Sequence, residues 1–318
     1  TNNSASGGNI IANSTRLDTD AYVFQATFNN NRWAGDLLAY RANSSGVSAV
    51  PDWNAASRLP KNADTARNIF YWSDNIGPNK GDQFLWSNLS TAERALFGTG
   101  TAAQDVFNFI RGSGAREFAN GGTLRDRSPT TALADIAHSS PAYSRDSEVV
   151  FVGSNGGMLH AFSTRPLSAT NSTLPGTELF AYVPSAVLPR LRNLAAVGYN
   201  VNHEYFVDGD VTVSARVGTT PGRNYLVATL GRGGQGLFAL DVTDPYNFTS
   251  NDVSWEYFPN NDSNSANDDP DLGRMLGRPV IATAADGTDV VLVGNGYNST
   301  NESAALYVFN LTTGELIR

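Results

Sequence analysis

The chain alternates short apolar stretches with turns rich in Gly, Asn and Ser. The apolar stretches are β-branched and aromatic, which favours strands, and the turn residues supply the positive φ angles that tight hairpins need. Four segments repeat this strand–turn–strand pattern, at residues 21–40, 149–162, 225–242 and 290–311. The second strands carry a similar signature, in Leu38-Ala39-Tyr40, His160-Ala161-Phe162, Phe238-Ala239-Leu240 and Tyr307-Val308-Phe309. The pattern therefore predicts four related hairpins.

Further short strands flank these hairpins. Three precede a hairpin, at 141–143, 211–213 and 279–281, and four follow one, at 52–53, 179–183, 255–258 and 316–317. Repeated units of four strands are typical of propeller blades, whereas a β-sandwich does not usually repeat one hairpin motif four times. We therefore predict an all-β fold, a β-propeller of four-stranded antiparallel blades.

Residues 1–318 are predicted to form part or all of one β-propeller domain, with residues 1–20 as an N-terminal lead-in. Four hairpins are few for a closed ring, and the strand at 313–316 leads toward a further unit. We expect an incomplete ring and a natural protein that continues past Arg318. The start at Thr1 without Met fits a fragment or a chain whose leader has been removed.

One region departs from the strand pattern. Ser90 and Glu93 form a capping box that predicts a short helix to about residue 96 or 97. Val106, Phe107 and Ile110 recur at helical spacing and predict a second helix over 102–111. We interpret residues 83–128 as a small helical insertion between blades, and expect a short helix or turn at 186–194.

The charge balance and the lack of cysteine exclude several functions. The formal net charge is −8, which disfavours binding to a phosphate backbone, so we expect no nucleic-acid partner. No Cys is present, which removes disulfides, cysteine-ligated metals and thiol catalysis. No apolar run is long enough to span a membrane, and we expect no membrane insertion.

Several stretches, in order along nearly the whole chain, carry a family resemblance. They are FNNNRWAGDLLAY at 28–40, GGTLRDR at 121–127, LADIAHSSP at 133–141, VGSNGGMLHAF at 152–162, FVDG at 206–209, GGQGLFALDVTDP at 233–245, DLG at 271–273 and GNGYNST at 294–300. In these stretches the sequence resembles the carboxy-terminal β-propeller region of the PilC/PilY family of type IV pilus tip-associated adhesins. The stretch at 152–162 is the most specific of them.

The resemblance implies a non-enzymatic binding and assembly module that acts in pilus biogenesis, surface or host-cell attachment and twitching motility. Implied partners are minor pilins or the pilus tip complex, and a host or surface receptor. The implied location is the cell surface at the pilus tip, or the outer membrane, after export through the periplasm. We expect the insertion at 83–128 and an acidic loop at 260–271 to contact partners.

The chain also departs from the family pattern. Gly156 replaces an Asp in the stretch at 152–162, and the string Arg111-Gly112-Ser113 lacks the carboxylate of the Arg-Gly-Asp tripeptide found in some members. The EF-hand-like calcium loop of the family has no match within these residues. Calcium regulation therefore cannot be transferred to a residue of this chain.

The acidic loop is the candidate calcium site on its own chemistry. Ca²⁺ takes six to eight oxygen ligands, and this loop offers several, although EF-hand spacing fails at Ala266. A solvated acidic loop is the alternative. The candidate ligands are Asp262, Asn264, Asp268, Asp269 and Asp271.

Other motifs favour structural roles. Gly231–Gly236 fits G-x-G-x-x-G, but a strand rather than a helix is predicted after it, which favours a wide, flexible hairpin turn over a nucleotide site. His138, His160 and His203 show no metal-ligand spacing and are interpreted as structural. A Ser–His–Asp triad is not excluded by inventory, but no G-x-S-x-G motif occurs. The tryptophans are interpreted as blade core rather than as platforms for sugar stacking, with one or two able to face a groove; they are Trp33, Trp53, Trp72, Trp86 and Trp255.

Two rival hypotheses remain. The turn at 309–314 resembles the strand-turn repeat of quinoprotein dehydrogenases, propeller enzymes that hold a calcium-bound quinone. Only one such turn is clear, and the adjacent-cysteine element of many members is impossible here. The other rival is a purely structural subunit of an extracellular filament.

Overall fold

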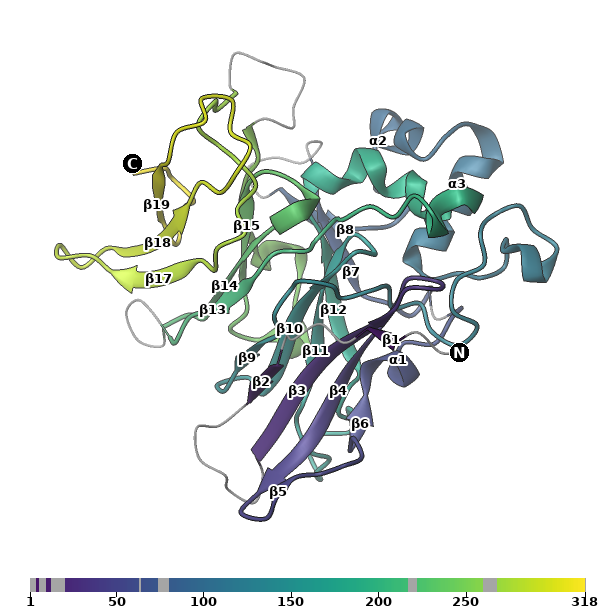
Figure 1. Cartoon of the computed structure of the whole chain (residues 1–318), viewed down its shortest axis with the longest axis horizontal. Helices are drawn as coiled ribbons and strands as arrows, with labels where there is room; N and C mark the ends of the chain where they lie inside the picture. Colours follow the sequence, from purple (N-terminus) through teal and green to yellow (C-terminus); the bar gives the residue numbers. More distant parts are fainter. Residues whose placement is uncertain are drawn as a thin grey trace.

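Short strands and tight turns build most of the computed structural model (Figure 1). The structure describes residues 4–5, 10–12, 21–62, 64–73, 80–216, 222–259 and 268–317. Nineteen strands within these residues form four sheets that follow one another in chain order. All four predicted hairpins are present as antiparallel pairs, β3–β4, β10–β11, β14–β15 and β18–β19.

The four sheets differ in size. The first contains β1 (Ser4–Ala5), β2 (Ile10–Ala12), β3 (Ala21–Asn29), β4 (Ala34–Asn43), β5 (Gly46–Val47) and β6 (Trp53–Asn54). The second contains β7 (Ile69–Trp72), β8 (Gly81–Gln83), β9 (Ala142–Ser144), β10 (Val149–Ser154), β11 (Met158–Ser163) and β12 (Glu178–Val183). The third contains β13 (Val211–Val213), β14 (Tyr225–Thr229), β15 (Leu237–Asp241) and β16 (Val253–Tyr257). The fourth contains β17 (Val280–Thr283), β18 (Asp289–Gly294) and β19 (Leu306–Asn310).

Helical segments are few and short. The α-helices are α1 (Ala55–Arg58), α2 (Thr91–Leu96) and α3 (Gly100–Arg111). The 3₁₀ segments are η1 (Phe118–Asn120), η2 (Ser185–Ala195), η3 (Val197–Asn200), η4 (Gly231–Gly233), η5 (Pro245–Asn247) and η6 (Ser250–Asp252). Of the described residues, none belongs to a helix with the length and apolar character needed to cross a bilayer.

The sheets pack face to face because their central strands are apolar on both sides. In β10, Val150 and Val152 face the first sheet, while Val149 and Phe151 belong to the core shared with the third. Successive residues of a strand point to opposite faces, so one apolar strand contributes to two cores. In the third sheet, β14 and β15 likewise separate the largest core from the one shared with the fourth sheet. This stacking of successive sheets confirms the all-β prediction.

The structure corrects the prediction of four strands in every unit. Only the third sheet has four, because β7 and β8 add to the second sheet beyond β12 and strands near the N-terminus enlarge the first. β7 pairs with β12 in parallel, with Ile69 opposite Ala181. Ile69, Phe70 and Tyr71 are all buried, so β7 shows no alternation that would reveal it as a strand. The last strand predicted, at 316–317, is reduced to one bridge between Phe309 and Leu316.

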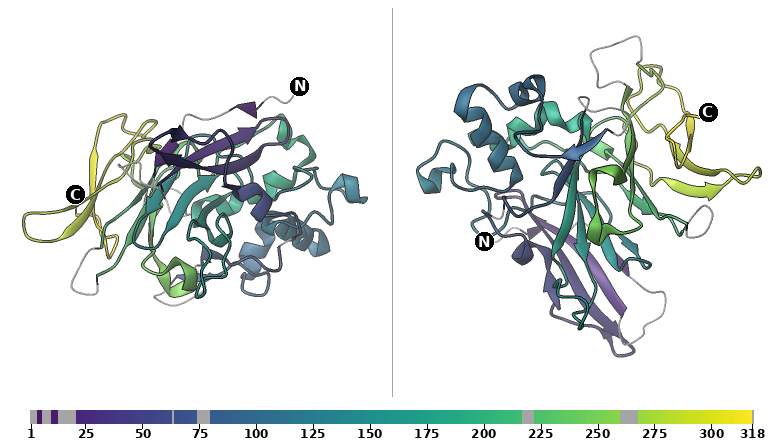
Figure 2. Two further views of the ribbon diagram at one scale, coloured as in Figure 1. Left: turned by 90° about the horizontal axis from the view of Figure 1, so that it is seen from below. Right: turned by 180° about the vertical axis from the view of Figure 1, so that it is seen from behind.

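The helices predicted in the insertion are present. The Ser90 hydroxyl accepts from the Glu93 backbone N–H at 3.0 Å, and the Ser90 N–H donates to the Glu93 carboxylate at 2.7 Å, which completes the capping box of α2. Phe107 and Ile110 of α3 enter the largest core. The two helices and the fourth sheet lie at opposite ends of the molecule (Figure 2). The predicted segment near 186–194 is the 3₁₀ helix η2.

Candidate functional site

Residues from three separate family-like stretches meet in one buried network. Asn155, just after β10, donates through Nδ2 to Asp135 at 2.7 Å and to Asp208 at 3.3 Å. Its side-chain oxygen accepts the Phe206 backbone N–H at 3.0 Å. Asn155 thus joins the loop before β9, the β10–β11 turn and the loop before β13. Buried polar groups that are all paired hold such junctions rigid.

Two of the three histidines pair with carboxylates of this network. His203 Nε2 lies 3.0 Å from Asp135, and its ring stacks on Trp33 at 3.7 Å between centroids. His138 Nδ1 lies 2.7 Å from Asp208. Burial raises the pKa of Asp208 despite the opposing effect of His138 and Asn155. These pairs give both histidines the structural partners expected of them.

The third histidine lies in a Ser–His–Glu arrangement. His160 Nε2 is 2.9 Å from Ser154 Oγ, and His160 Nδ1 is 2.7 Å from Glu178. Burial would raise the pKa of Glu178, but the Arg67 guanidinium and His160 together lower it to about 2. Burial also lowers the pKa of His160. Triad geometry of this kind is found in hydrolases.

This arrangement does not offer a nucleophile to a substrate. Ser154 is 1% exposed and its Oγ also accepts the Gly156 N–H at 3.3 Å. Glu178 is held by two Arg67 nitrogens at 2.7 and 2.8 Å. Neither Ser154 nor His160 lines the groove at Trp53, the groove at Asp36 or the groove at Tyr297. The cluster is therefore a buried polar brace that joins β10, β11 and β12 to the segment just before β7.

Another buried carboxylate, that of Glu117, anchors the helical insertion. Glu117 is fully buried and forms ion pairs with Lys61 and with Arg127, the latter at 2.9 Å. Arg127 also donates to the Phe109 carbonyl at 2.8 Å and lies 3.8 Å over the Phe109 ring. Arg127, the last residue of the GGTLRDR stretch, therefore connects the end of α3 to the following loop.

The candidate calcium loop is seen only in part. Asp262 and Asn264 lie outside the described residues. Asp269 accepts the Tyr257 hydroxyl at 2.8 Å and the Tyr307 hydroxyl at 2.6 Å, while Asp271 accepts from Asn301 at 2.8 Å.

Asp269 and Asp271 therefore face hydrogen-bond donors, and Asp268 is exposed. Burial, with Asp269 adding to it, raises the pKa of both tyrosines, which remain donors. Within the described part of the chain, no three acidic or histidine side chains cluster as a metal site would require. Calcium binding at this loop stays a prediction.

The glycine-rich motif is a close-packed turn. Gly231–Gly233 forms η4, and β15 follows it as predicted, so no helix N-terminus is available for a phosphate. A Cβ at Gly233 would lie 1.6 Å from the Phe206 carbonyl oxygen. The turn is therefore held against its neighbour, rather than wide and flexible as expected.

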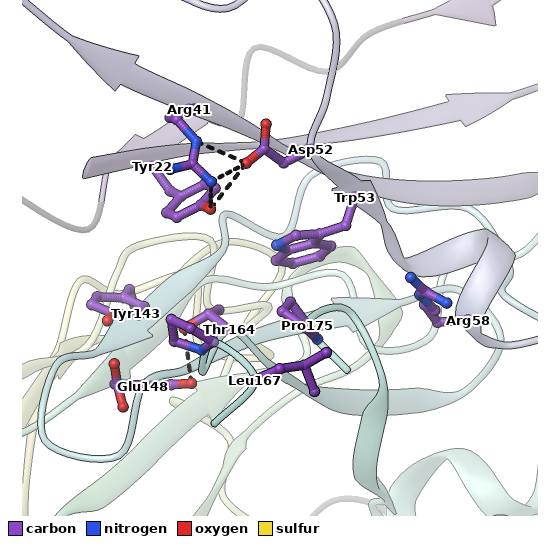
Figure 3. Close-up of a pocket in the computed structure, with 11 residues that line it drawn as sticks. Tyr22, Arg41, Asp52, Trp53, Arg58, Tyr143, Glu148, Thr164, Leu167 and Pro175 are labelled. Atoms are coloured by element: carbon purple, nitrogen blue, oxygen red, sulfur yellow. Dashed lines mark hydrogen bonds and ion pairs between the residues drawn. The ribbon is translucent and has the colours of Figure 1, made fainter. Parts of the chain in front are cut away.

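An open groove of about 430 Å³ lies between the first and second sheets (Figure 3). One wall comes from β3, β4, β6 and α1, and the other from β9, the turn before β10 and the segment after β11. The lining residues are Tyr22, Arg41, Asp52, Trp53, Arg58, Tyr143, Glu148, Thr164, Pro166, Leu167 and Pro175. Of these residues, only Trp53 belongs to the tryptophans of which one or two were expected to face a groove, because residues so far apart give no local signal of meeting.

Comparison with known proteins places this architecture in a family. The sequence model described as the PilY1 beta-propeller domain matches residues 127–318, more than half of the chain. The type IV pilus biogenesis factor PilY1 homolog of Xylella fastidiosa is 35% identical over 97% of this chain and 25% of its own length. PilY1 of Pseudomonas aeruginosa strain UCBPP-PA14 is 33% identical over 93% of this chain and 27% of its length. The chain thus spans about a quarter of these relatives.

A solved structure is also similar in sequence. The crystal structure of the Pseudomonas aeruginosa PilY1 C-terminal domain is 36% identical, with a TM-score of 0.39, over 54% of this chain and 29% of that chain. The matched family region holds Asn155, Asp135 and Asp208, together with β9–β12 of the second sheet and all of the third and fourth sheets. The stacked sheets are therefore propeller blades, and the chain belongs to the PilY1 β-propeller domain family.

Proposed function

We propose that this chain is a non-enzymatic binding and assembly module that acts in type IV pilus biogenesis. The observation that carries the proposal is the similarity of 93–97% of the chain to proteins named type IV pilus biogenesis factors. Ser154, His160 and Glu178 are buried and hydrogen-bonded to protein groups, which supports a role without catalysis. Stacked blades hold their loops rigidly, and loops on a rigid scaffold are suited to binding.

The finer role that we propose is attachment. A module of this kind at the pilus tip or outer membrane, exported through the periplasm, would contact minor pilins and a host or surface receptor, and would support twitching motility. The helical insertion is the candidate pilin contact. It projects from one end of the molecule (Figure 2), and η1 displays Phe118 with 52% of its surface exposed. Exposed aromatic residues often dominate binding energies.

The test is complementation in the source bacterium after deletion of the gene. We expect deletion to remove surface pili, and the full gene to restore them. Phe118→Asp should lower the pilin recovered by shearing several-fold, because a charge replaces an aromatic contact. Val47→Asp, at a residue 55% exposed in the first sheet, is the matched control and should restore pili fully.

Surface pilin is measured by immunoblot, and the location of the protein by immunogold electron microscopy. Normal piliation after deletion would refute the proposed function. Equal effects of the two substitutions would show that the insertion is not the pilin contact, but would not contradict the role in biogenesis. Melting temperatures of the purified variants separate lost binding from lost folding.

A further inference from the structure

We infer that the groove between the first two sheets binds a neutral saccharide. Its principal feature is an unpaired donor: among the described residues nothing accepts a hydrogen bond from the indole Nε1 of Trp53. The Trp53 side chain is only 8% exposed. Figure 3 shows the indole between the two walls, with its nitrogen toward the side of Tyr22 and Tyr143. The nitrogen is not one of the fully buried unpaired polar atoms of the described residues, so it is accessible from the groove, where a ligand oxygen would accept its hydrogen bond.

The groove also offers unused acceptors. Asp52 receives all its hydrogen bonds through Oδ2, from the Tyr22 hydroxyl at 3.0 Å and from Arg41 at 2.8 and 3.0 Å. Its Oδ1 has no partner in the described part of the chain. Glu148 pairs with Arg165 through Oε2 at 3.2 Å, which leaves Oε1 available. Each of these carboxylates therefore has one oxygen free for a ligand.

The mixture of donors and acceptors identifies the ligand chemistry. A sugar hydroxyl both donates and accepts, so it suits a site that presents an indole N–H, a guanidinium and carboxylate oxygens together. A proline-rich peptide would present mainly carbonyl acceptors, since Pro has no N–H. Arg41 and Arg58 balance Asp52 and Glu148, so the charged lining has no net charge and favours a neutral ligand.

Shape and apolar surface agree with this ligand. The volume of about 430 Å³ falls in the usual range for small-molecule clefts, roughly 300–1,000 Å³. The Tyr143 ring is backed by the Phe24 ring at 5.8 Å between centroids, and Leu167, farther along the same wall, is 55% exposed (Figure 3). The C–H face of a pyranose ring would pack on such a surface, while its hydroxyls reach the polar groups of the walls.

The loop opposite Trp53 holds the indole in place. Gly176 has a φ of +84°, and a Cβ there would lie 2.7 Å from Trp53 Cε3. The loop therefore contacts the indole directly, which fixes the ring and the direction of its N–H. A donor that is already oriented loses little entropy when a ligand binds.

This inference rests on the proposed binding function for its cellular setting, but its test uses the purified chain and is separate from piliation. The probes are glucose, galactose, mannose, N-acetylglucosamine and their β-1,4-linked disaccharides, detected by saturation-transfer NMR and titrated by calorimetry. At least one is expected to bind. Trp53→Phe removes the N–H but keeps an aromatic ring, and Asp52→Asn replaces the free carboxylate oxygen on an exposed side chain.

Each substitution is expected to weaken binding about tenfold, the effect of one lost hydrogen bond. Trp72→Phe, in β7 and outside the groove lining, is the matched control and should bind normally. Absence of binding by every probe at millimolar concentration, or equal affinity in all three variants, would overturn the inference. Binding of a proline hexapeptide that is lost in Trp53→Phe would assign the groove to a peptide instead. Pili can assemble normally whichever result is obtained.

Discussion

At the scale of single residues, the fold depends on buried charges that are each matched by a partner. Glu178 lies between Arg67 and His160, and Glu117 between Lys61 and Arg127. A buried carboxylate without a partner would be strongly destabilising, so each cluster acts as a unit. Removing one side chain of a cluster should therefore lower the free energy of unfolding by more than the loss of one hydrogen bond would.

The stability of the protein is expected to fall as the pH is lowered. The pKa of Glu178 is about 2, against an ordinary value of 4.5, so its contribution is full above about pH 4.5 and is lost toward pH 2. That shift corresponds to about 3 kcal/mol. The pKa of His160 is also lowered, so its protonation costs stability once the pH falls below its ordinary value of 6.5. Urea unfolding at a series of pH values between about 7 and 3 measures both effects.

The variant His160→Gln separates the two groups. It removes the group that titrates near neutral pH, so the loss of stability between about pH 7 and 5 should shrink. The loss below about pH 4.5 should persist, because Arg67 still pairs with Glu178. An unfolding free energy that does not change down to pH 3 would contradict this account.

At the scale of elements, local sequence and tertiary packing contribute differently. The hairpins and α2 carry their own signals, namely turn residues and a capping box. By contrast, β7 carries no such local signal and takes its place in the sheet by pairing with β12 on one side and β8 on the other.

Loss of the cap should destabilise α2 in a measurable way. Ser90→Ala removes the side-chain acceptor of the Glu93 N–H, and we expect a loss of about 1 kcal/mol in the free energy of unfolding. Ser87→Ala is the control, since Ser87 is exposed and caps no helix. Thermal unfolding by circular dichroism distinguishes the two, and an equal effect would show that the cap is not the cause.

At the scale of the whole molecule, each sheet is stabilised by the sheets next to it in the chain. Three separate apolar cores lie between successive sheets, and the fourth sheet contributes to only one of them. Phe309 is fully buried in that core, with its ring 5.8 Å from Trp255 and 4.9 Å from Tyr257. Nearest-neighbour stacking of this kind allows one end of the molecule to open before the rest.

Removing that aromatic ring should loosen the fourth sheet selectively. Phe309→Ala leaves a cavity and should lower the free energy of unfolding by about 3–5 kcal/mol. We expect amide hydrogen exchange to accelerate more in β17–β19 than in β9–β12. Phe162→Ala, in the core between the first two sheets, should instead accelerate exchange in β3 and β4. Uniform acceleration across all four sheets would show that the molecule opens as a single unit.

Sequence alone determined what depends on neighbours along the chain. Short apolar strands, glycine turns and the Ser90 cap specify hairpins and helices within a few residues, so the all-β class and the helical insertion were predictable. The family-like stretches were also visible as strings of residues. The domain limits remain predictions, as does calcium at Asp268, Asp269 and Asp271.

Only the tertiary structure decided what depends on residues far apart in the chain. The parallel pairing of β7 with β12 joins strands about a hundred residues apart, with Ile69 opposite Ala181. The groove brings Trp53 to Tyr143, and the buried brace brings Arg67 to Glu178. No local sequence pattern predicts these contacts. They form when the apolar faces of the sheets stack, because the polar side chains buried there must then hydrogen-bond across the interface.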